Sequence, residues 1–68
     1  MKGNNVRALR AYFGWSQAKA ARFLNISPTA YKQKETGVRP FTLNEAYKLA
    51  KVANKNIEEI FFTDEVTI

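Results

Sequence analysis

The sequence predicts a single compact all-α domain made of five short helices. Three observations lead to this prediction. The chain has 68 residues, which is about the length of one small domain. Apolar residues recur three and four positions apart along most of it, and the stretches they define are bounded by residues that commonly begin or end helices. The core of such a domain needs no strand.

The first two helices are predicted over residues 6–13 and about 17–24. Asn4 or Asn5 can cap the first helix, and Gly14 ends it. Ser16 is a good N-cap for the second helix, which ends at Asn25 because asparagine tolerates a left-handed backbone. The apolar faces consist of Val6, Leu9, Phe13, Ala18, Ala20, Ala21 and Leu24, with Tyr12, Trp15 and Phe23 expected in the core or at its edge.

The third helix is predicted over about residues 28–36. Ser27 is a preferred N-cap, and Pro28 falls at the first helical position, where its missing N–H has no cost. Gly37 ends the helix, and a loop follows. Tyr31 is expected on the inward side of this helix.

The last two helices each begin with a residue pair typical of a capping box, in which the two residues bond each other's backbone. Thr42 with Glu45 opens the fourth helix, and Asn56 with Glu59 opens a short fifth helix. The residues expected to face the core are Leu43, Ala46, Leu49, Ala50 and Ala53, followed by Ile57, Ile60 and Phe61. The domain is thus predicted over residues 1–62, with residues 63–68 as a short C-terminal tail.

The composition argues against an enzyme. The chain has no histidine and no cysteine, so the commonest general bases, covalent nucleophiles and transition-metal ligands are missing. The carboxylates show no pairing suited to acid–base chemistry. We therefore expect no catalytic residue, no metal and no cofactor. The chain also lacks a signal peptide and any apolar run of membrane-spanning length, so a cytoplasmic protein without a membrane partner is expected.

Positive charge is concentrated in the first part of the chain. Residues 1–40 contain eight basic residues and one acidic residue, a net charge of +7, whereas residues 41–68 have a net charge of −2. A basic segment of this kind is typical of a protein that binds the phosphate backbone of a nucleic acid. The alternative is a solvated basic face that only maintains solubility.

Residues 17–36 form a predicted helix-turn-helix, in which a small residue such as Ala21 fits where the two helices cross. The outward side of the second helix then presents hydrogen-bonding side chains suited to the major groove of double-stranded DNA. The expected base contacts are Thr29, Lys32 and Gln33, with a phosphate contact as the alternative for Lys32. The expected phosphate contacts are Gln17, Lys34, Thr36 and Arg39.

These features resemble the lambda-repressor-like, Cro/C1-type helix-turn-helix family, also called the XRE family, over residues 6–61. The matching marks are Ser16-Gln17, Ala21, Ile26-Ser27, the Glu35-x-Gly37-x-Arg39 pattern and the closing segment 57–61. Three positions depart from the family pattern. The family usually has glycine where Asn25 stands, an apolar residue where Lys34 stands and a polar residue where Pro28 stands. We expect the Lys34 side chain to extend outward to a phosphate.

The resemblance implies a five-helix lambda-repressor-like domain that regulates transcription as a homodimer on a palindromic operator in a bacterium or phage. It also implies that Arg10 pairs with Glu35 and that Gln17 contacts a phosphate. An antitoxin or protein-interaction module with the same fold, bound to a protein partner, is the alternative function.

The C-terminal residues raise a separate question. Phe61 and Phe62 are adjacent, and neighbours on a helix diverge by about 100°, so both cannot face the same core. The surplus aromatic Phe62, together with Val66 and Ile68, is interpreted either as a dimer contact or as a tail folded back over its own domain.

Overall fold

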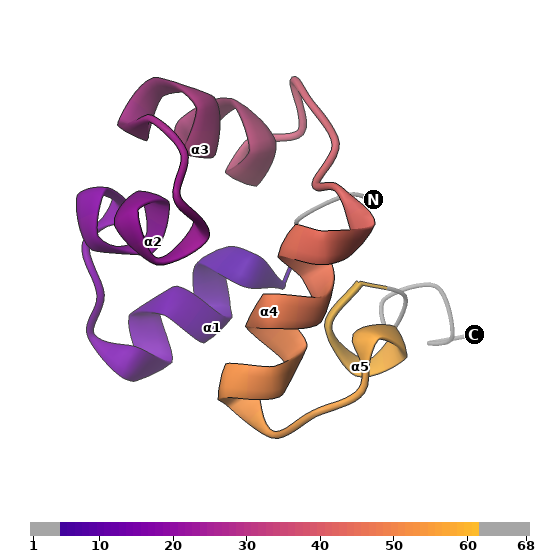
Figure 1. Cartoon of the computed structure of the whole chain (residues 1–68). Helices are drawn as coiled ribbons and strands as arrows, with labels where there is room; N and C mark the ends of the chain where they lie inside the picture. The colour runs from indigo at the N-terminus through magenta and orange to yellow at the C-terminus, as the bar shows by residue number, and fades with distance from the viewer. Residues whose placement is uncertain (1–4, 62–68) are drawn as a thin grey trace.

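The computed structural model describes residues 5–61 and contains five helices packed around one core (Figure 1). Within that range no strand occurs, and the all-α prediction is confirmed. Phe62, Val66 and Ile68 lie outside the described residues. The helices are α1 (Val6–Phe13), α2 (Gln17–Leu24), α3 (Pro28–Glu35), α4 (Leu43–Ala53) and α5 (Ile57–Phe61).

Local capping explains where the middle helices begin. The Ser16 and Ser27 hydroxyls each accept a hydrogen bond from the backbone N–H three residues later. Thr42 and Glu45 form the complete capping box at the start of α4. Asn25 ends α2 with φ 61°, in the left-handed region that asparagine tolerates. These predicted boundaries are therefore confirmed.

The cap of the first helix differs from the prediction, whereas one bond of the box predicted for the last helix is present. Asn5 occupies the N-cap position of α1, but its side chain makes no capping hydrogen bond. Its Nδ2 instead donates to the Ile60 carbonyl at 2.9 Å, which joins the start of α1 to α5. At the start of α5, the Asn56 N–H donates to Glu59 Oε1 at 2.7 Å, which is one half of the predicted capping box.

The core is centred on Tyr31, which is fully buried. Its ring meets Phe41 edge-on at 6.2 Å, and Phe41 in turn meets Phe61 at 5.8 Å. These aromatic contacts bring α3, the segment before α4 and α5 into one cluster. The other buried apolar residues are Val6, Ala20, Ala21, Leu24, Ala46, Leu49, Ala50 and Ile60.

Three predicted core positions are wrong. Tyr12 is 84% exposed, because it directly precedes Phe13 and only one of two helical neighbours can face the core. Leu43 is 63% exposed, since it is the first residue of α4 and Glu45 takes the inward place in that turn. Ala18 is also exposed, in the first turn of α2. Among residues 5–61, no helix has the length and apolar character that crossing a membrane requires.

Candidate nucleic-acid interface

Helices α2 and α3 pack against each other and are joined by the short turn 25–27. The Ile26 N–H donates to the Ala21 carbonyl at 3.0 Å, which closes the end of α2 and directs the chain into α3. Ala21 is only 1% exposed, as expected for a small residue between crossing helices. Figure 1 shows α3 at the top edge of the domain, above α2 and α1.

The outward edge of α3 is open to solvent. Thr29 and Lys32 are exposed and Gln33 is partly exposed, whereas Tyr31 is buried on the opposite side of the helix. The three predicted base contacts therefore lie on one accessible edge. The Gln33 side chain has a neighbour in the loop after α3: Arg39 Nη1 donates to Gln33 Oε1 at 3.4 Å.

The predicted phosphate contacts fall in different environments. Arg39 is exposed in the loop after α3, next to Gln33. Gln17 is partly exposed at the start of α2, and its Nε2 donates to Glu35 Oε1 at 3.0 Å. Thr36 is exposed, but its single hydroxyl proton points back to the Lys32 carbonyl at 2.9 Å. Donation from Thr36 to a phosphate would therefore require breaking that bond.

The expected position of Lys34 at the surface is wrong. Its side chain is 8% exposed, and its Nζ lies 2.7 Å from both carboxylate oxygens of Glu45. The cause is helical geometry. Position 34 is three residues after Tyr31, so it lies on the buried side of α3, and Glu45 supplies the charge that makes burial of a lysine tolerable.

The carboxylate of Glu35 joins three helices. Its side chain has no solvent exposure, and Arg10 Nε of α1 lies 2.8 Å from Oε2, so the predicted Arg10–Glu35 pair is confirmed. Tyr31 Oη donates to Oε2 at 2.6 Å, and Gln17 Nε2 of α2 donates to Oε1. Arg7 Nε is 3.8 Å from the same oxygen. Sequence reasoning missed Tyr31 and Gln17 as partners. The spacing of four residues between Tyr31 and Glu35 was a signal for the first contact. No local signal pointed to Gln17, because it belongs to another helix.

The buried groups have perturbed acidities. Burial alone would raise the pKa of Glu35, but hydrogen bonds from Arg10, Tyr31 and Gln17 outweigh it, and the pKa falls below its ordinary value of 4.5. The pKa of Glu45 is lowered in the same way, against the effect of burial, mainly by its bond to Lys34. Burial, and then the bond to Glu35, raise the pKa of Tyr31.

These shifts predict loss of stability in acid. A carboxylate whose folded pKa is depressed binds fewer protons when folded than when unfolded, so its stabilisation is complete well above 4.5 and is lost as the pH falls through the folded pKa. Urea unfolding at about pH 6 and about pH 3 should show a lower midpoint at the acid value. Glu45→Gln should reduce this difference, and an identical acid loss in that variant would contradict the contribution of Glu45.

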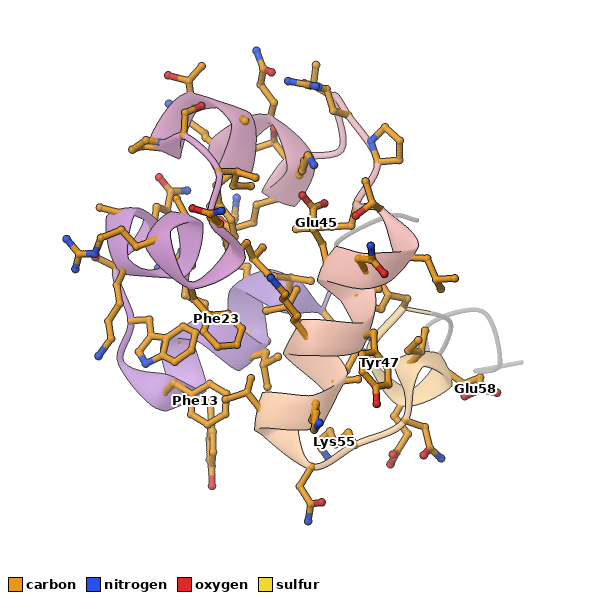
Figure 2. All side chains as sticks on the ribbon, in the orientation of Figure 1. Phe13, Phe23, Glu45, Tyr47, Lys55 and Glu58 are labelled. Atoms are coloured by element: carbon orange, nitrogen blue, oxygen red, sulfur yellow. The ribbon has the colours of Figure 1, made fainter. Side chains whose placement is uncertain are left out.

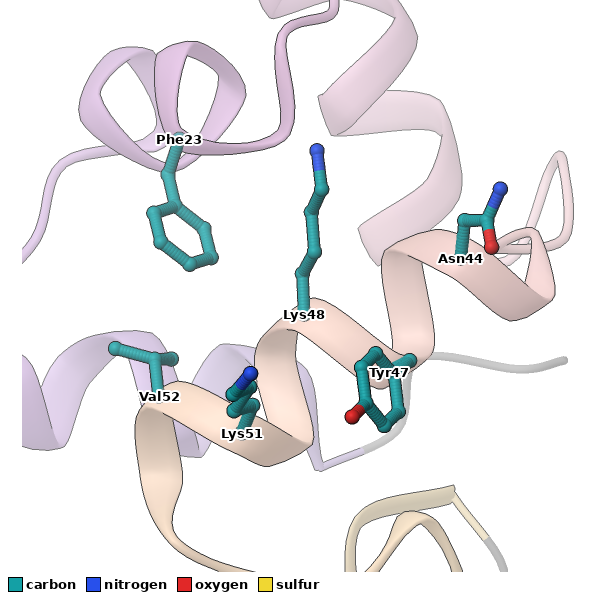
Figure 3. A pocket seen from close by; sticks show the side chains of 6 residues that line it. All are labelled: Phe23, Asn44, Tyr47, Lys48, Lys51 and Val52. Carbon is teal, nitrogen blue, oxygen red and sulfur yellow. The ribbon is translucent and has the colours of Figure 1, made fainter.

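A second surface feature is an open groove of about 610 Å³ between α2 and α4 (Figure 3). Among its lining residues, Lys51 Nζ lies 5.8 Å from the centroid of the Tyr47 ring. The groove includes no residue of α3 and is thus separate from the edge that presents Thr29 and Gln33. Its lining consists of Phe23, Asn44, Tyr47, Lys48, Lys51 and Val52.

The α2–α3 pair, its open outer edge and the surrounding helices define the class of helix-turn-helix domains with a lambda-repressor-like fold. The chain belongs to the helix-turn-helix family, whose sequence profile matches residues 6–60. The resemblance noted from the sequence is thereby confirmed.

Two similar proteins are described as the HTH-type transcriptional regulator RamB, from Mycobacterium tuberculosis strains CDC 1551 / Oshkosh and ATCC 25618 / H37Rv. Each is 36% identical to this chain over 63 residues, which cover 93% of the chain. The chain spans 13% of the length of these relatives. No solved structure matches the chain significantly.

Proposed function

We propose that this chain is a sequence-specific reader of double-stranded DNA in a transcription regulator, with α3 lying in the major groove. The observation that supports this function is the accessible outer edge of α3, where Thr29, Lys32 and Gln33 present hydrogen-bonding groups. The major groove is wide enough for one helix and displays a distinct pattern of donors and acceptors for each base pair. In this arrangement Gln33 pairs with an adenine, Lys32 donates to a guanine or a phosphate, and Thr29 contacts a thymine methyl group or a base-edge acceptor.

Phosphate contacts flank this edge in the proposal. Arg39 is exposed in the loop beside the end of α3, and Gln17 lies at the first turn of α2. The N–H groups at the start of α2 point away from the helix and favour an anion, so a phosphate placed there meets both the Gln17 side chain and the helix end. Lys34 takes no part, because Glu45 holds it inside the domain.

Two copies of the chain bind one operator in this proposal. A single small domain makes few base contacts, whereas two domains on half-sites about 34 Å apart combine their contacts on one duplex. The operator is then an inverted repeat, since a two-fold symmetric pair of proteins requires two-fold symmetric DNA.

Selection of bound duplexes from a random pool tests this function. We expect enrichment of one sequence arranged as an inverted repeat, and binding to it that weakens steeply between about 50 and 200 mM salt. A pool that yields no enriched sequence at low salt would contradict sequence-specific binding. Enrichment of a single, non-repeated site would contradict the dimer and retain the DNA-binding function.

Arg39→Ala is expected to weaken binding to all duplexes alike. Removing one phosphate contact lowers affinity without changing base preference and reduces the slope of log affinity against log salt by about 1. Lys55→Ala is the matched control, because Lys55 is exposed in the loop after α4, far from α3, and its removal takes away one positive charge (Figure 2). Equal effects of the two substitutions would show that Arg39 acts only through net charge.

The groove between α2 and α4 supports a second candidate, a protein-interaction or antitoxin module. Phe23, Tyr47 and Val52 leave apolar surface open there, and such surface is typical of protein contacts. A mostly apolar contact keeps its affinity as salt rises, whereas DNA binding does not. The salt dependence measured for each partner therefore separates the two candidates.

A further inference from the structure

The ion pair between Lys34 and Glu45 joins the last turn of α3 to the first turn of α4. Lys34 Nζ lies 2.7 Å from both Glu45 oxygens, and the two side chains are 8% and 11% exposed. An ion pair removed from water to this degree adds little net stability compared with apolar residues of similar size. Its position in the fold therefore calls for an explanation other than stability.

The same carboxylate also organises the start of α4. Glu45 Oε1 accepts a hydrogen bond from the Thr42 N–H at 2.9 Å, and the Glu45 N–H donates to Thr42 Oγ1 at 3.2 Å. Because Oε1 also contacts Lys34, one side chain links the end of α3 with the residue at which α4 begins. The two ends of the loop 36–42 are thus held by one group.

The loop between these ends folds back onto Gln33. The Val38 and Arg39 N–H groups both donate to the Gln33 carbonyl, at 2.8 and 3.1 Å, and Gly37 turns the chain with φ 91°. This turn places the Arg39 guanidinium 3.4 Å from Gln33 Oε1. Arg39 is thereby set beside one of the proposed base contacts.

We infer that Lys34 and Glu45 are positioning residues for DNA binding, which hold the loop 36–42 in the shape that keeps Arg39 beside Gln33. This inference rests on the proposed function. An apolar residue at position 34 fills the same space but cannot bond a carboxylate that also fixes the start of α4. The pair therefore fixes where the phosphate contact of Arg39 lies relative to the base-reading edge of α3.

A double-substitution cycle tests the coupling. Lys34→Met with Glu45→Gln removes both charges and keeps an amide oxygen that can accept from the Thr42 N–H. Affinity for the selected duplex is measured for the unaltered chain, Arg39→Ala, the Lys34/Glu45 variant and the triple variant. We expect Arg39→Ala to cost about tenfold in the unaltered background and less than about twofold in the Lys34/Glu45 variant. A purely structural pair would give the same factor in both backgrounds, and that result would overturn the inference.

Hydrogen exchange without DNA gives an independent measurement. Loss of the pair should speed exchange of the Val38 and Arg39 amides, while that of Leu24 in α2 stays unchanged after correction for global stability. Lys34→Arg made alone, which keeps both the cation and Glu45, should leave exchange of these two amides slow. Should the first variant fail to fold, Glu45→Asp, which keeps both charges and shortens the linkage, replaces it in both measurements. If the unaltered chain binds no duplex, the proposed function is wrong, and unchanged exchange at Val38 and Arg39 would separately overturn the loop-holding role.

Discussion

Glu35→Ala is expected to unfold much of the protein at about 25 °C. The substitution leaves the Arg10 guanidinium without its carboxylate and the buried Tyr31 hydroxyl without its acceptor. Removing one partner of a buried ion pair costs about 3–5 kcal/mol, and the 20% exposure of the Arg10 side chain places the loss toward the lower end of that range. A core in a chain of this length contributes only about 3–5 kcal/mol of net stability, so the loss is comparable to the whole.

Thermal and urea unfolding followed by circular dichroism measure this effect. Glu35→Gln keeps an oxygen that can accept from Tyr31 and loses the charge, so we expect an intermediate loss. Lys55→Ala is the exposed control and should change stability by less than about 0.5 kcal/mol. An unfolding midpoint of Glu35→Ala equal to that of Lys55→Ala would contradict the role assigned to the Glu35 carboxylate.

Gln33→Ala is expected to cost about 1–3 kcal/mol of binding free energy on the selected duplex and to relax preference at one base position. The alanine side chain cannot donate to or accept from a base edge, whereas the phosphate contacts remain. Affinities for the selected duplex and its single-base variants locate the affected position.

A matched comparison guards against an indirect effect through Arg39, which bonds Gln33 in the free protein. Arg39→Ala removes the contact between Arg39 and Gln33 but keeps the Gln33 side chain, so it should leave base preference unchanged. Equal losses of affinity for selected and random duplexes in Gln33→Ala would refute the base-contact assignment.

The helix boundaries could be predicted from the sequence because the signals that set them are local. Ser16, Ser27 and the Thr42–Glu45 pair each bond backbone groups within three residues, so their effect does not depend on the rest of the fold. Asn5 shows the limit of this reasoning. Its amide has a partner 55 residues away, and only the packing of α5 beside α1 creates that alternative.

The candidate site was predicted in part. The open edge with Thr29, Lys32 and Gln33 follows from the helical position of Tyr31 and was correctly placed on the surface. Lys34 was assigned by its charge rather than its position, and its buried partner Glu45 is contributed by another helix. Only the packing of α3 against α4 shows that this lysine pairs with a carboxylate inside the domain.

The most direct test of the central claim is a nuclear magnetic resonance titration of the isotope-labelled chain with the selected duplex. If α3 enters the major groove, the largest shifts will fall on Thr29, Lys32, Gln33 and Arg39, and the groove residues Tyr47 and Val52 will stay unchanged. Shifts confined to the groove between α2 and α4, with residues 29–33 unaffected, would contradict the assignment of α3 as the DNA-reading helix.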